Sequence, residues 1–589
     1  MSQPLTWRAR RTAFMHQMHA RRAARGGGAH AFVSQPEPRT VGLFARGRQL
    51  VAGNLLFSGT LTQGNDVSVW DIVTDRPDVI DEIQGCAWLD DLAAVGDTRA
   101  RALAQRWVFE WIDRYGRGTG PGWTPEITGR RLIRWINHSI FLLRGQDSAS
   151  SQRFFRSLGH QTQFLARRWR TTAPGLPLFE ALTGLIHAGL ALEGMEKHTA
   201  PAFDALSRQC REKIGPAGEI ATRNPEELLE IFALLNWTLI ALREAGRAGP
   251  SEVRDAIARI APTLRALRHA DGALARFHGG GRGVDGRLDQ ALAQSQVRTR
   301  GGNGLYMGYQ RETAGRTSIV IDATPPPTGP VSYNAHASTL AFELTSGRRP
   351  LIVNCGSGRS FGAEWRRAGR ATPSHTTLCI EGYSSSLLGA PARLAPNRQE
   401  WLISVPQDVR CESSNLPDGR RIELSHDGFR PSHGLTHARI IDVSHEGRGI
   451  VGEDLITTLT DKDKQGFDLA LKRSGLPGVP FAVRFHLHPD VDPTLDLGGA
   501  AVSLALKSGE IWVFRHDGAG VLALEPSVYL ENGRLKPRST QQMVLSGLAM
   551  SYATRVRWSL AKAQDTPDVV RDLGPKDAPD GDLDNGDAS

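Results

Sequence analysis

The stretch NAHASTLAFELTSGRRPLIVNCGSG (residues 334–358), followed after a short insert by EWRRAGRATPSHTTLCIEG (residues 364–382), predicts three consecutive strands. Apolar and polar residues alternate over residues 338–344, which is the period of a half-buried strand. Residues 350–356 are mostly apolar, and residues 375–382 begin on a histidine and end on a glycine. The stretch therefore indicates a sheet built from neighbouring strands with glycine turns.

Polar residues recur in this stretch where the predicted strands meet their turns. They are His336, Asn354, Arg370 and His375. Because strand ends that follow one another meet at a common edge, we expect these side chains to lie together at one rim of the sheet. A sugar-binding or catalytic cleft is the site that such a rim would build.

The hydrophobic period changes near residue 295. Windows between residues 88 and 272 repeat apolar residues every three or four positions, as amphipathic helices do. Beyond residue 295 the windows alternate with period two and are separated by Gly, Asp, Asn and Pro. This order predicts an α+β multidomain protein, with an N-terminal incomplete α/α toroid and a C-terminal antiparallel β-sandwich. The expected divisions are a basic arm (1–49), the toroid (50–295), the sandwich (296–562) and a disordered acidic tail (563–589).

Composition excludes several classes of protein. The 589 residues contain no apolar run of the roughly 20 residues that a membrane span needs. The arginine-rich start lacks the apolar core of a secretory signal. The five cysteines are widely spaced without a C-x-x-C pair, which argues against a disulfide framework and a zinc-thiolate site. We therefore expect a cytoplasmic protein with no nucleic-acid partner, while the oligomeric state stays open.

The two ends of the chain have opposite charge. Residues 1–49 hold nine arginines against the single acid Glu37, and residues 565–589 hold eight aspartates against Arg571 and Lys576. A charge run is most often a solvated face or a flexible arm, but the basic end leaves association with the cell envelope as an alternative.

The motifs of the second half resemble those of the heparinase II/III-like family of polysaccharide lyases. The C-terminal β domain of that family carries a His-x-[His/Asp] motif, an [Asp]-x-Gly turn, and an Arg that precedes Ala-His-Asn-Thr. The matching residues here are His336, Ser338, Phe342, Asn354, Gly356, Arg370 and Ser374-His375-Thr376-Thr377. Further similar segments extend the resemblance over roughly residues 50 to 560. It implies a toroid followed by a β-sandwich, and β-elimination on an acidic, uronate-containing glycan.

Elimination at a uronate requires a group that neutralises the carboxylate, a base and an acid. The resemblance implies that His336 completes this set from the β domain and that Glu180 matches the Glu of a toroid-helix motif. Where the family has Asn-His in that motif, this chain has Leu176-Pro177. The region that carries the family's tyrosine reads Arg223-Asn224-Pro225-Glu226-Glu227. Two of the three usual roles are therefore vacant at their usual positions.

Other side chains are the candidates for the vacant roles. The predicted catalytic residues are His336, His375, Arg370 and Tyr333. The predicted substrate-binding residues are Glu180, Arg223, Asn224, Asn354 and Arg134. These assignments rest on residue type and on position relative to the matched motifs.

No cofactor and no metal are expected. Some relatives hold zinc at the positions that Ser338, Asn354 and His375 occupy here, and only the histidine is a strong zinc ligand. His486 and His488 are two apart, which leaves metal chelation or ordinary hydrogen bonding open, with the second favoured. The glycine-rich segment 268–283 lacks a phosphate-loop pattern, and we expect it to close the toroid.

Three functions remain as hypotheses. The first is a polysaccharide lyase that acts on an acidic polysaccharide or oligosaccharide by a modified route. The second is a non-catalytic glycan-binding or envelope-associated protein that retains the lyase fold. The third is hydrolysis by a paired-carboxylate glycosidase.

Overall fold

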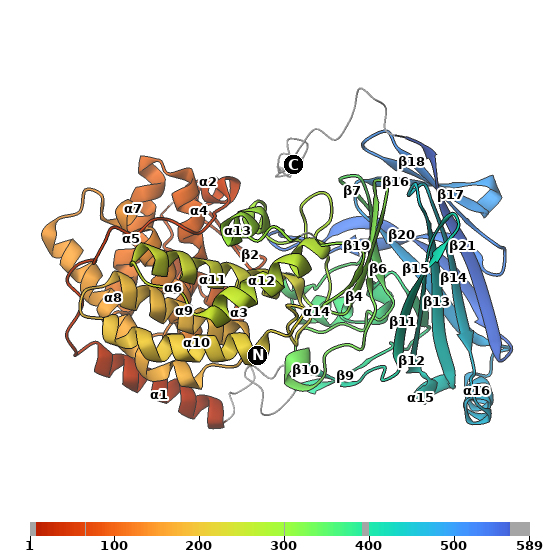
Figure 1. Cartoon of the computed structure of the whole chain (residues 1–589), viewed down its shortest axis with the longest axis horizontal. Coiled ribbons are helices and arrows are strands. Elements are labelled where there is room, and N and C mark those ends of the chain that lie inside the picture. The colour runs from red at the N-terminus through yellow and green to blue at the C-terminus, as the bar shows by residue number, and fades with distance from the viewer. Residues whose placement is uncertain (1–6, 65, 300, 392–399, 566–589) are drawn as a thin grey trace.

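The computed structural model describes residues 7–64, 66–299, 301–391 and 400–565. Helices fill the first half of the chain and strands the second, as Figure 1 shows, so the predicted order of toroid and sandwich is confirmed. The predicted acidic tail lies outside the described residues except for its first few positions.

The toroid consists of helices that follow one another through short turns. They are α1 (Trp7–Ala23), α2 (Phe44–Val51), α3 (Pro77–Gln84), α4 (Ala87–Val95), α5 (Thr98–Tyr115), α6 (Pro125–Asn137), α7 (Ser139–Leu143), α8 (Ser148–Arg168), α9 (Leu176–Ala191), α10 (Thr199–Lys213), α11 (Pro225–Glu244), α12 (Ser251–Ala266) and α13 (Arg287–Ser295). A hairpin of β1 (Asn54–Phe57) and β2 (Thr60–Gln63) lies between α2 and α3. The segment expected as a basic arm thus contains α1, which packs against α8 through His16 and Phe164, whose ring centroids lie 6.0 Å apart.

Two glycines let α6 and α9 approach closely. A Cβ at Gly129 would lie 2.4 Å from the carbonyl oxygen of Glu180, and a Cβ at Gly184 would lie 2.4 Å from the Cα of Gly129. Real side chains do not tolerate such distances, so the contact depends on glycine at both positions. The contact fixes Glu180 of α9 opposite Arg130 of α6.

The second half is a sandwich of two antiparallel sheets. One sheet has the order β11 (Val409–Leu416), β12 (Gly419–Phe429), β13 (Leu435–Ser444), β14 (Gly449–Thr457), β21 (Ala553–Gln564), β18 (Ile511–His516), β17 (Ala501–Leu506) and β16 (Val491–Asp496). The other has the order β19 (Val521–Tyr529), β20 (Arg538–Ala549), β15 (Val479–Leu487), β7 (Arg349–Val353), β6 (Phe342–Ser346), β5 (Thr317–Asp322), β4 (Tyr309–Ala314) and β3 (Gly304–Tyr306), and β8 (Leu378–Ile380) also pairs with β15. Smaller elements are β9 (Leu387–Pro391), β10 (Glu400–Ser404), α14 (Ala363–Gly369), α15 (Arg430–His433) and α16 (Asp461–Ser474).

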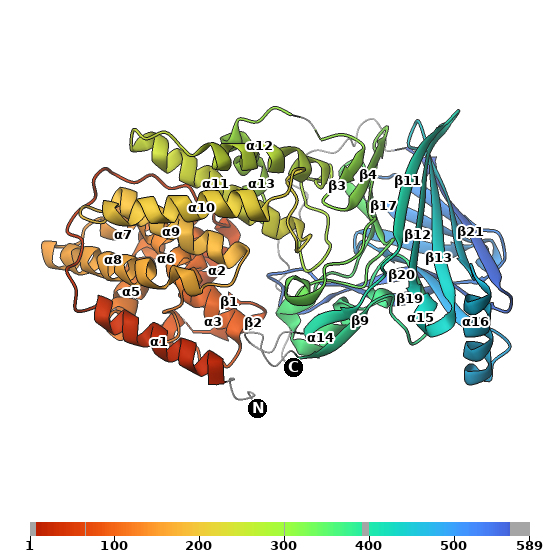
Figure 2. The same cartoon turned by 60° about the horizontal axis from the view of Figure 1, so that its bottom comes forward.

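The apolar core of the sandwich lies between the two sheets and includes Phe342, Phe485 and Trp558. The sheet that contains β3–β7 is the one nearer the toroid, as the second view shows (Figure 2). The first predicted strand is shorter than expected, because Leu340 adopts a left-handed φ of 64° and β6 begins only at Phe342. The strand is also buried on both faces rather than half-buried, since Glu343 is 3 % exposed. His269 and Arg276 of the toroid cover that face.

Candidate functional site

A cleft of about 2430 Å³ separates the toroid from the sandwich. Its toroid wall comes from α1, α2, α3, α6, α9, the start of α11 and the loop between α12 and α13. Its sandwich wall comes mainly from residues 330–333, 348–350, 359–360, 488–490 and 529–538. Three of the predicted site residues line it: Glu180, Arg134 and Tyr333. His336, His375, Arg370, Arg223, Asn224 and Asn354 do not.

The toroid wall of the cleft carries ionisable groups in close contact. Arg130 Nε lies 3.3 Å from Glu180 Oε2. Burial raises the pKa of Glu180 to about 7, although Arg130 opposes the shift. The neighbouring Arg134 donates to Asp90 at 2.8 Å and to the carbonyl oxygen of Gly85 at 3.1 Å, so its guanidinium is already bound within the protein.

Tyr333 stands on the sandwich side of the cleft. Its hydroxyl lies 3.4 Å from Glu227 Oε2, which belongs to the first turn of α11. Burial and the nearby carboxylate raise the pKa of Tyr333, and burial also raises that of Glu227. Both groups therefore keep their protons to a higher pH than they would in water.

Arg359 is a cation of this region that the sequence did not single out. It lies in a short 3₁₀ turn (Arg359–Phe361) between two glycines with positive φ, Gly358 and Gly362. The residue is exposed and lines the cleft, and none of the described residues forms a hydrogen bond or an ion pair with its guanidinium. Burial raises the pKa of both Asp81 and Glu226, and the charge of Arg359 opposes that rise. The sequence did offer a signal for Arg359, because it is a charged residue between two glycines just after the Asn-x-Gly motif.

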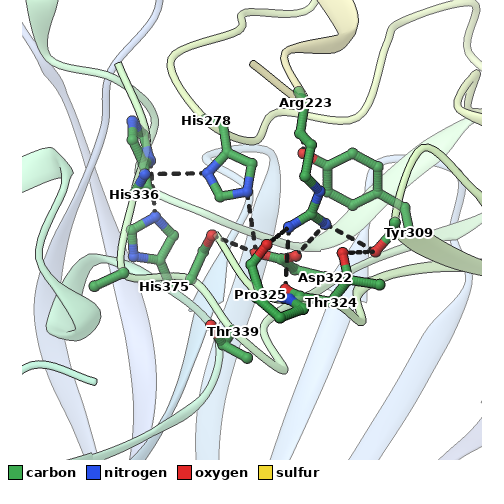
Figure 3. Close-up of polar contacts among 12 residues, drawn as sticks. Arg223, His278, Tyr309, Asp322, Thr324, Pro325, His336, Thr339 and His375 are labelled. Carbon is green, nitrogen blue, oxygen red and sulfur yellow. Dashed lines mark hydrogen bonds and ion pairs between the residues drawn. The ribbon is translucent and has the colours of Figure 1, made fainter. Parts of the chain in front are cut away.

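The predicted rim residues do meet, but inside the protein. Figure 3 shows His336 between His278 and His375. His375 Nδ1 donates to the carbonyl oxygen of Ala371 at 2.9 Å, so His375 Nε2 accepts from His336 Nδ1 at 3.0 Å. The backbone N–H of His336 donates to His278 Nδ1 at 3.1 Å. His336 is 2 % exposed and His375 is fully buried.

Burial keeps these histidines neutral. It lowers the pKa of His336 well below its ordinary value, that of His375 to about 4 and that of His278 to about 3. Two adjacent imidazoles cannot both become charged in such surroundings without a large electrostatic cost. At neutral pH the group is a fixed hydrogen-bond chain.

Asp322 and Arg223 continue this chain across the domain boundary. Arg223 Nη2 donates to Asp322 Oδ1 at 2.6 Å (Figure 3). Ser338 Oγ donates to Asp322 Oδ2 at 2.6 Å. The remaining Arg223 donors bind the carbonyl oxygens of Met307, Gly308, Thr324 and Pro325 at 2.8–3.1 Å. Burial opposes ionisation of Asp322, yet Arg223 and His278 lower its pKa overall. Arg223 thus forms buried hydrogen bonds and an ion pair that join the toroid to the sandwich.

The other predicted binding residues are also bound within the protein. Asn224 caps α11, because its Oδ1 accepts from the backbone N–H groups of Glu226 and Glu227 at 3.0 and 3.2 Å. Asn354 Oδ1 accepts from the backbone N–H of Thr376 at 3.0 Å. Arg370 donates to the carbonyl oxygens of Ala335, Glu400 and Ser332 at 2.8, 3.0 and 2.8 Å.

Within the described ranges no three His, Cys, Asp or Glu side chains are grouped as metal ligands. His486 Nδ1 bonds with Ser527 Oγ at 2.7 Å and its Nε2 with the carbonyl oxygen of Pro373 at 2.9 Å. His488 lies apart from it, in the cleft wall. Across the same described ranges no helix is long and apolar enough to span a membrane.

Comparisons with known proteins extend this picture. The model of the heparinase II/III-like C-terminal domain matches residues 297–559. FtsZ-localized protein C of Caulobacter vibrioides is 30% identical over 527 residues, which are 88% of each chain. A crystal structure of heparinase III has a TM-score of 0.66 at 13% identity and covers 93% of this chain and 89% of its own. A mutant of heparan sulfate lyase HepC from Pedobacter heparinus has a TM-score of 0.55 at 12% identity, over 94% and 89%. At 12–13% identity, these two structural matches show that the fold is shared.

Proposed function

This chain belongs to the heparinase II/III-like family, and we propose that it binds an acidic polysaccharide or oligosaccharide in its cleft rather than cleaving one. One observation carries the proposal. Of the four side chains expected to perform the elimination, only Tyr333 lines the cleft, while His336, His375 and Arg370 are buried and engaged in hydrogen bonds.

The chemistry of the cleft supports binding. Elimination requires a base and an acid whose pKa values lie near the working pH. The raised pKa of Tyr333 leaves its phenolate, the form that would act as a base, almost unpopulated at neutral pH. Of these two groups Glu180 alone has a pKa near 7, and it is paired with Arg130 at 3.3 Å. Arg359 and Arg130 supply positive charge for an acidic group of a ligand. Arg359 has no partner in the described protein and is the group most available to a uronate.

The test is a titration of uronate-containing oligosaccharides by calorimetry, together with a search for unsaturated products by near-ultraviolet absorbance. We expect binding that weakens as salt is raised, and no product. Arg359→Gln should weaken binding about tenfold, because charge-assisted hydrogen bonds to arginine are lost. The matched control is Arg410→Gln, which removes an exposed arginine paired with Asp408 at 3.0 Å, and it should leave binding unchanged.

Two results would overturn this proposal. Unsaturated product from the wild-type protein that disappears in Tyr333→Phe would establish the lyase hypothesis, with the cleft tyrosine in the role expected for it. Equal affinity of the wild type and Arg359→Gln would remove Arg359 from the binding surface.

A second candidate function is attachment to the cell envelope at the site of FtsZ. Its support is the 30% identity over 88% of both chains with FtsZ-localized protein C, together with the outer face of α1. On that face Trp7, Phe14 and Met18 are 71%, 65% and 42% exposed, and their spacing of seven and four residues places them in one stripe. Arginines flank the stripe, which is the composition of helices that lie on anionic lipid surfaces.

Pelleting with vesicles tests the membrane part of this candidate. The full chain should pellet with vesicles that contain phosphatidylglycerol and stay in solution with neutral phosphatidylcholine vesicles. Trp7→Glu with Phe14→Glu should abolish pelleting, whereas Val73→Glu, which changes a residue 99% exposed elsewhere on the toroid, should not. Pelleting with FtsZ polymers tests the other part, and absence from both pellets would dismiss the candidate.

A further inference from the structure

The cleft wall carries a second group of hydrogen-bond donors besides the residues around Glu180 and Tyr333. Arg276 and Arg282 come from the loop between α12 and α13, which was expected to close the toroid. His488 follows β15, Tyr529 ends β19, and Arg538 begins β20. All five line the cleft, and we call them the Arg276 cluster.

Arg276 is held at the base of the cluster with part of its guanidinium unused. It is 6% exposed, and its Nη2 donates to the carbonyl oxygens of Cys355 and Leu530 at 3.1 and 2.7 Å. The guanidinium carbon lies 4.0 Å from the centroid of the Tyr529 ring. Nη1 forms no hydrogen bond with any described residue. Leaving a buried charged donor unsatisfied is costly, so the position suits an acceptor from a ligand.

Gly356 of the Asn-x-Gly motif makes room for this arginine. Its φ is 102°, and a Cβ at this position would lie 2.2 Å from Arg276 Nη2 and 2.6 Å from the carbonyl oxygen of Leu530. Any residue with a side chain would displace the guanidinium. The placement of Arg276 is therefore built into the loop.

His488 offers a second unused donor. Its Nδ1 accepts from the backbone N–H of Asp490 at 3.2 Å, so the proton of the neutral ring resides on Nε2. Nε2 has no hydrogen-bond partner in the described part of the chain, although the residue is only 8% exposed. Burial lowers the pKa of His488 to about 3. At physiological pH it is a neutral donor, and its ring packs edge-on against Tyr529 with centroids 5.0 Å apart.

The cluster has an excess of positive charge. Five cations line this part of the cleft: Arg276, Arg282, Arg538, Arg534 and Lys507. Four carboxylates of the described residues contact them: Asp490, Glu531 and Asp285 through ion pairs, and Glu343, which accepts from the backbone N–H of Arg276 at 3.0 Å. Arg282 lies 3.4 Å from Asp285 and 3.9 Å from Glu531, and Arg538 lies 3.3 Å from Asp490 and 4.0 Å from Glu531. Among these contacts only that of Arg538 with Asp490 is a hydrogen bond, so most donors of both guanidiniums are unused within the described residues.

We infer that the Arg276 cluster is an anion-binding subsite that takes a sulfate or phosphate ester group. A tetrahedral oxyanion presents several acceptor oxygens in different directions, which matches donors that arrive from Arg276 Nη1, His488 Nε2 and the arginines at the rim. The anion site stands on its own geometry. That the ester belongs to a glycan rests on the function proposed above.

Inorganic sulfate and inorganic phosphate, each titrated into the full chain by calorimetry at constant ionic strength, are the probes. We expect saturable binding, with the better-bound anion indicating which ester the site takes. Arg282→Gln with Arg538→Gln should weaken binding at least about tenfold. Arg410→Gln again serves as the control and should bind as the wild type does.

Arg276→Met tests the base of the site. If this variant folds, it should lose anion binding altogether. If it does not fold, the double variant Arg282→Gln with Arg538→Gln, called the rim variant, decides. Arg282 is 39% and Arg538 28% exposed, and neither is needed for the core. Wild-type affinity in the rim variant, or no saturable binding in the wild type, would overturn the subsite.

Oligosaccharides with and without sulfate esters separate this inference from the proposed function. Loss of inorganic sulfate binding in the rim variant, without any glycan binding in the wild type, would sustain the subsite and refute the glycan-binding function. Glycan binding that is independent of both sulfation and the rim arginines would sustain that function and refute the subsite.

Discussion

Removal of the Arg223 guanidinium should loosen the junction between the two domains. In Arg223→Met, Asp322 keeps its burial, loses the donor at 2.6 Å and retains Ser338 as its partner. Four carbonyl oxygens of the sandwich lose a donor at the same time. Breaking one side of a buried ion pair destabilises a protein by about 3–5 kcal/mol, because an uncompensated charge remains. At about 2 °C per kcal/mol the unfolding midpoint should fall by about 6–10 °C.

The assay is thermal unfolding together with small-angle scattering. Arg439→Met is the matched control, because Arg439 pairs with Asp454 at 2.8 Å and both are fully buried inside the sandwich. Both variants should melt earlier, but only Arg223→Met should increase the radius of gyration below the transition. Arg223→Met combined with Asp322→Asn should be less destabilised than the sum of the two changes, since the stranded charge is gone. This role of Arg223 would be refuted if Arg223→Met unfolded at the same temperature as the wild type. It would also be refuted if the destabilisation of the double variant equalled the sum of the two single destabilisations.

Three further outcomes are expected. Burial lowers the pKa of His336, and that of His375 to about 4, so the unfolded chain binds protons near pH 6.5 before the folded chain does. The stability that these histidines contribute should therefore be complete above pH 6.5 and fall toward pH 4. His336→Gln should make the urea midpoint less dependent on pH over that range. The raised pKa of Glu180, about 7, has the opposite sign, so Glu180→Gln should melt above the wild type at pH 8 and match it at pH 4. Gly356→Ala should cost about 1–3 kcal/mol in urea unfolding and weaken sulfate binding by displacing Arg276, and an unchanged sulfate affinity would contradict that role.

The order of domains was predictable because it depends on local periodicity. Helical windows and alternating strands carry their period in neighbouring residues, and the change near residue 295 falls between the end of α13 and the start of β3 at Gly304. The gathering of His336, Asn354 and His375 was predictable for a similar reason, since strand ends fix position along the edge of a sheet. How deeply these three side chains are buried was not predictable from that pattern.

Burial of this group depends on partners that are remote in sequence. Arg223 lies 99 positions from Asp322 and supplies the charge that lets the carboxylate stay buried. Arg276 depends on the absence of a side chain at Gly356, and Arg359 matters because it is left without a partner in the described structure. No local signal reports the contacts of Arg223 and Arg276. Residue type alone therefore placed the histidines and Arg223 in the cleft and passed over Arg276 and Arg359.

The buried junction explains how the fold persists at the positions where the family resemblance implied metal ligands. Ser338 and Asn354 are neutral groups that bind Asp322 and the backbone N–H of Thr376. A buried carboxylate such as Asp322 needs a counter-charge, because desolvation of an isolated charge is prohibitive. The toroid provides it through Arg223, so this buried group attaches the two domains to each other. The arginines of the cleft walls stay charged near neutral pH, which suits them to the anion binding proposed above, whereas Glu180, with a pKa of about 7, is a wall group that can exchange a proton there.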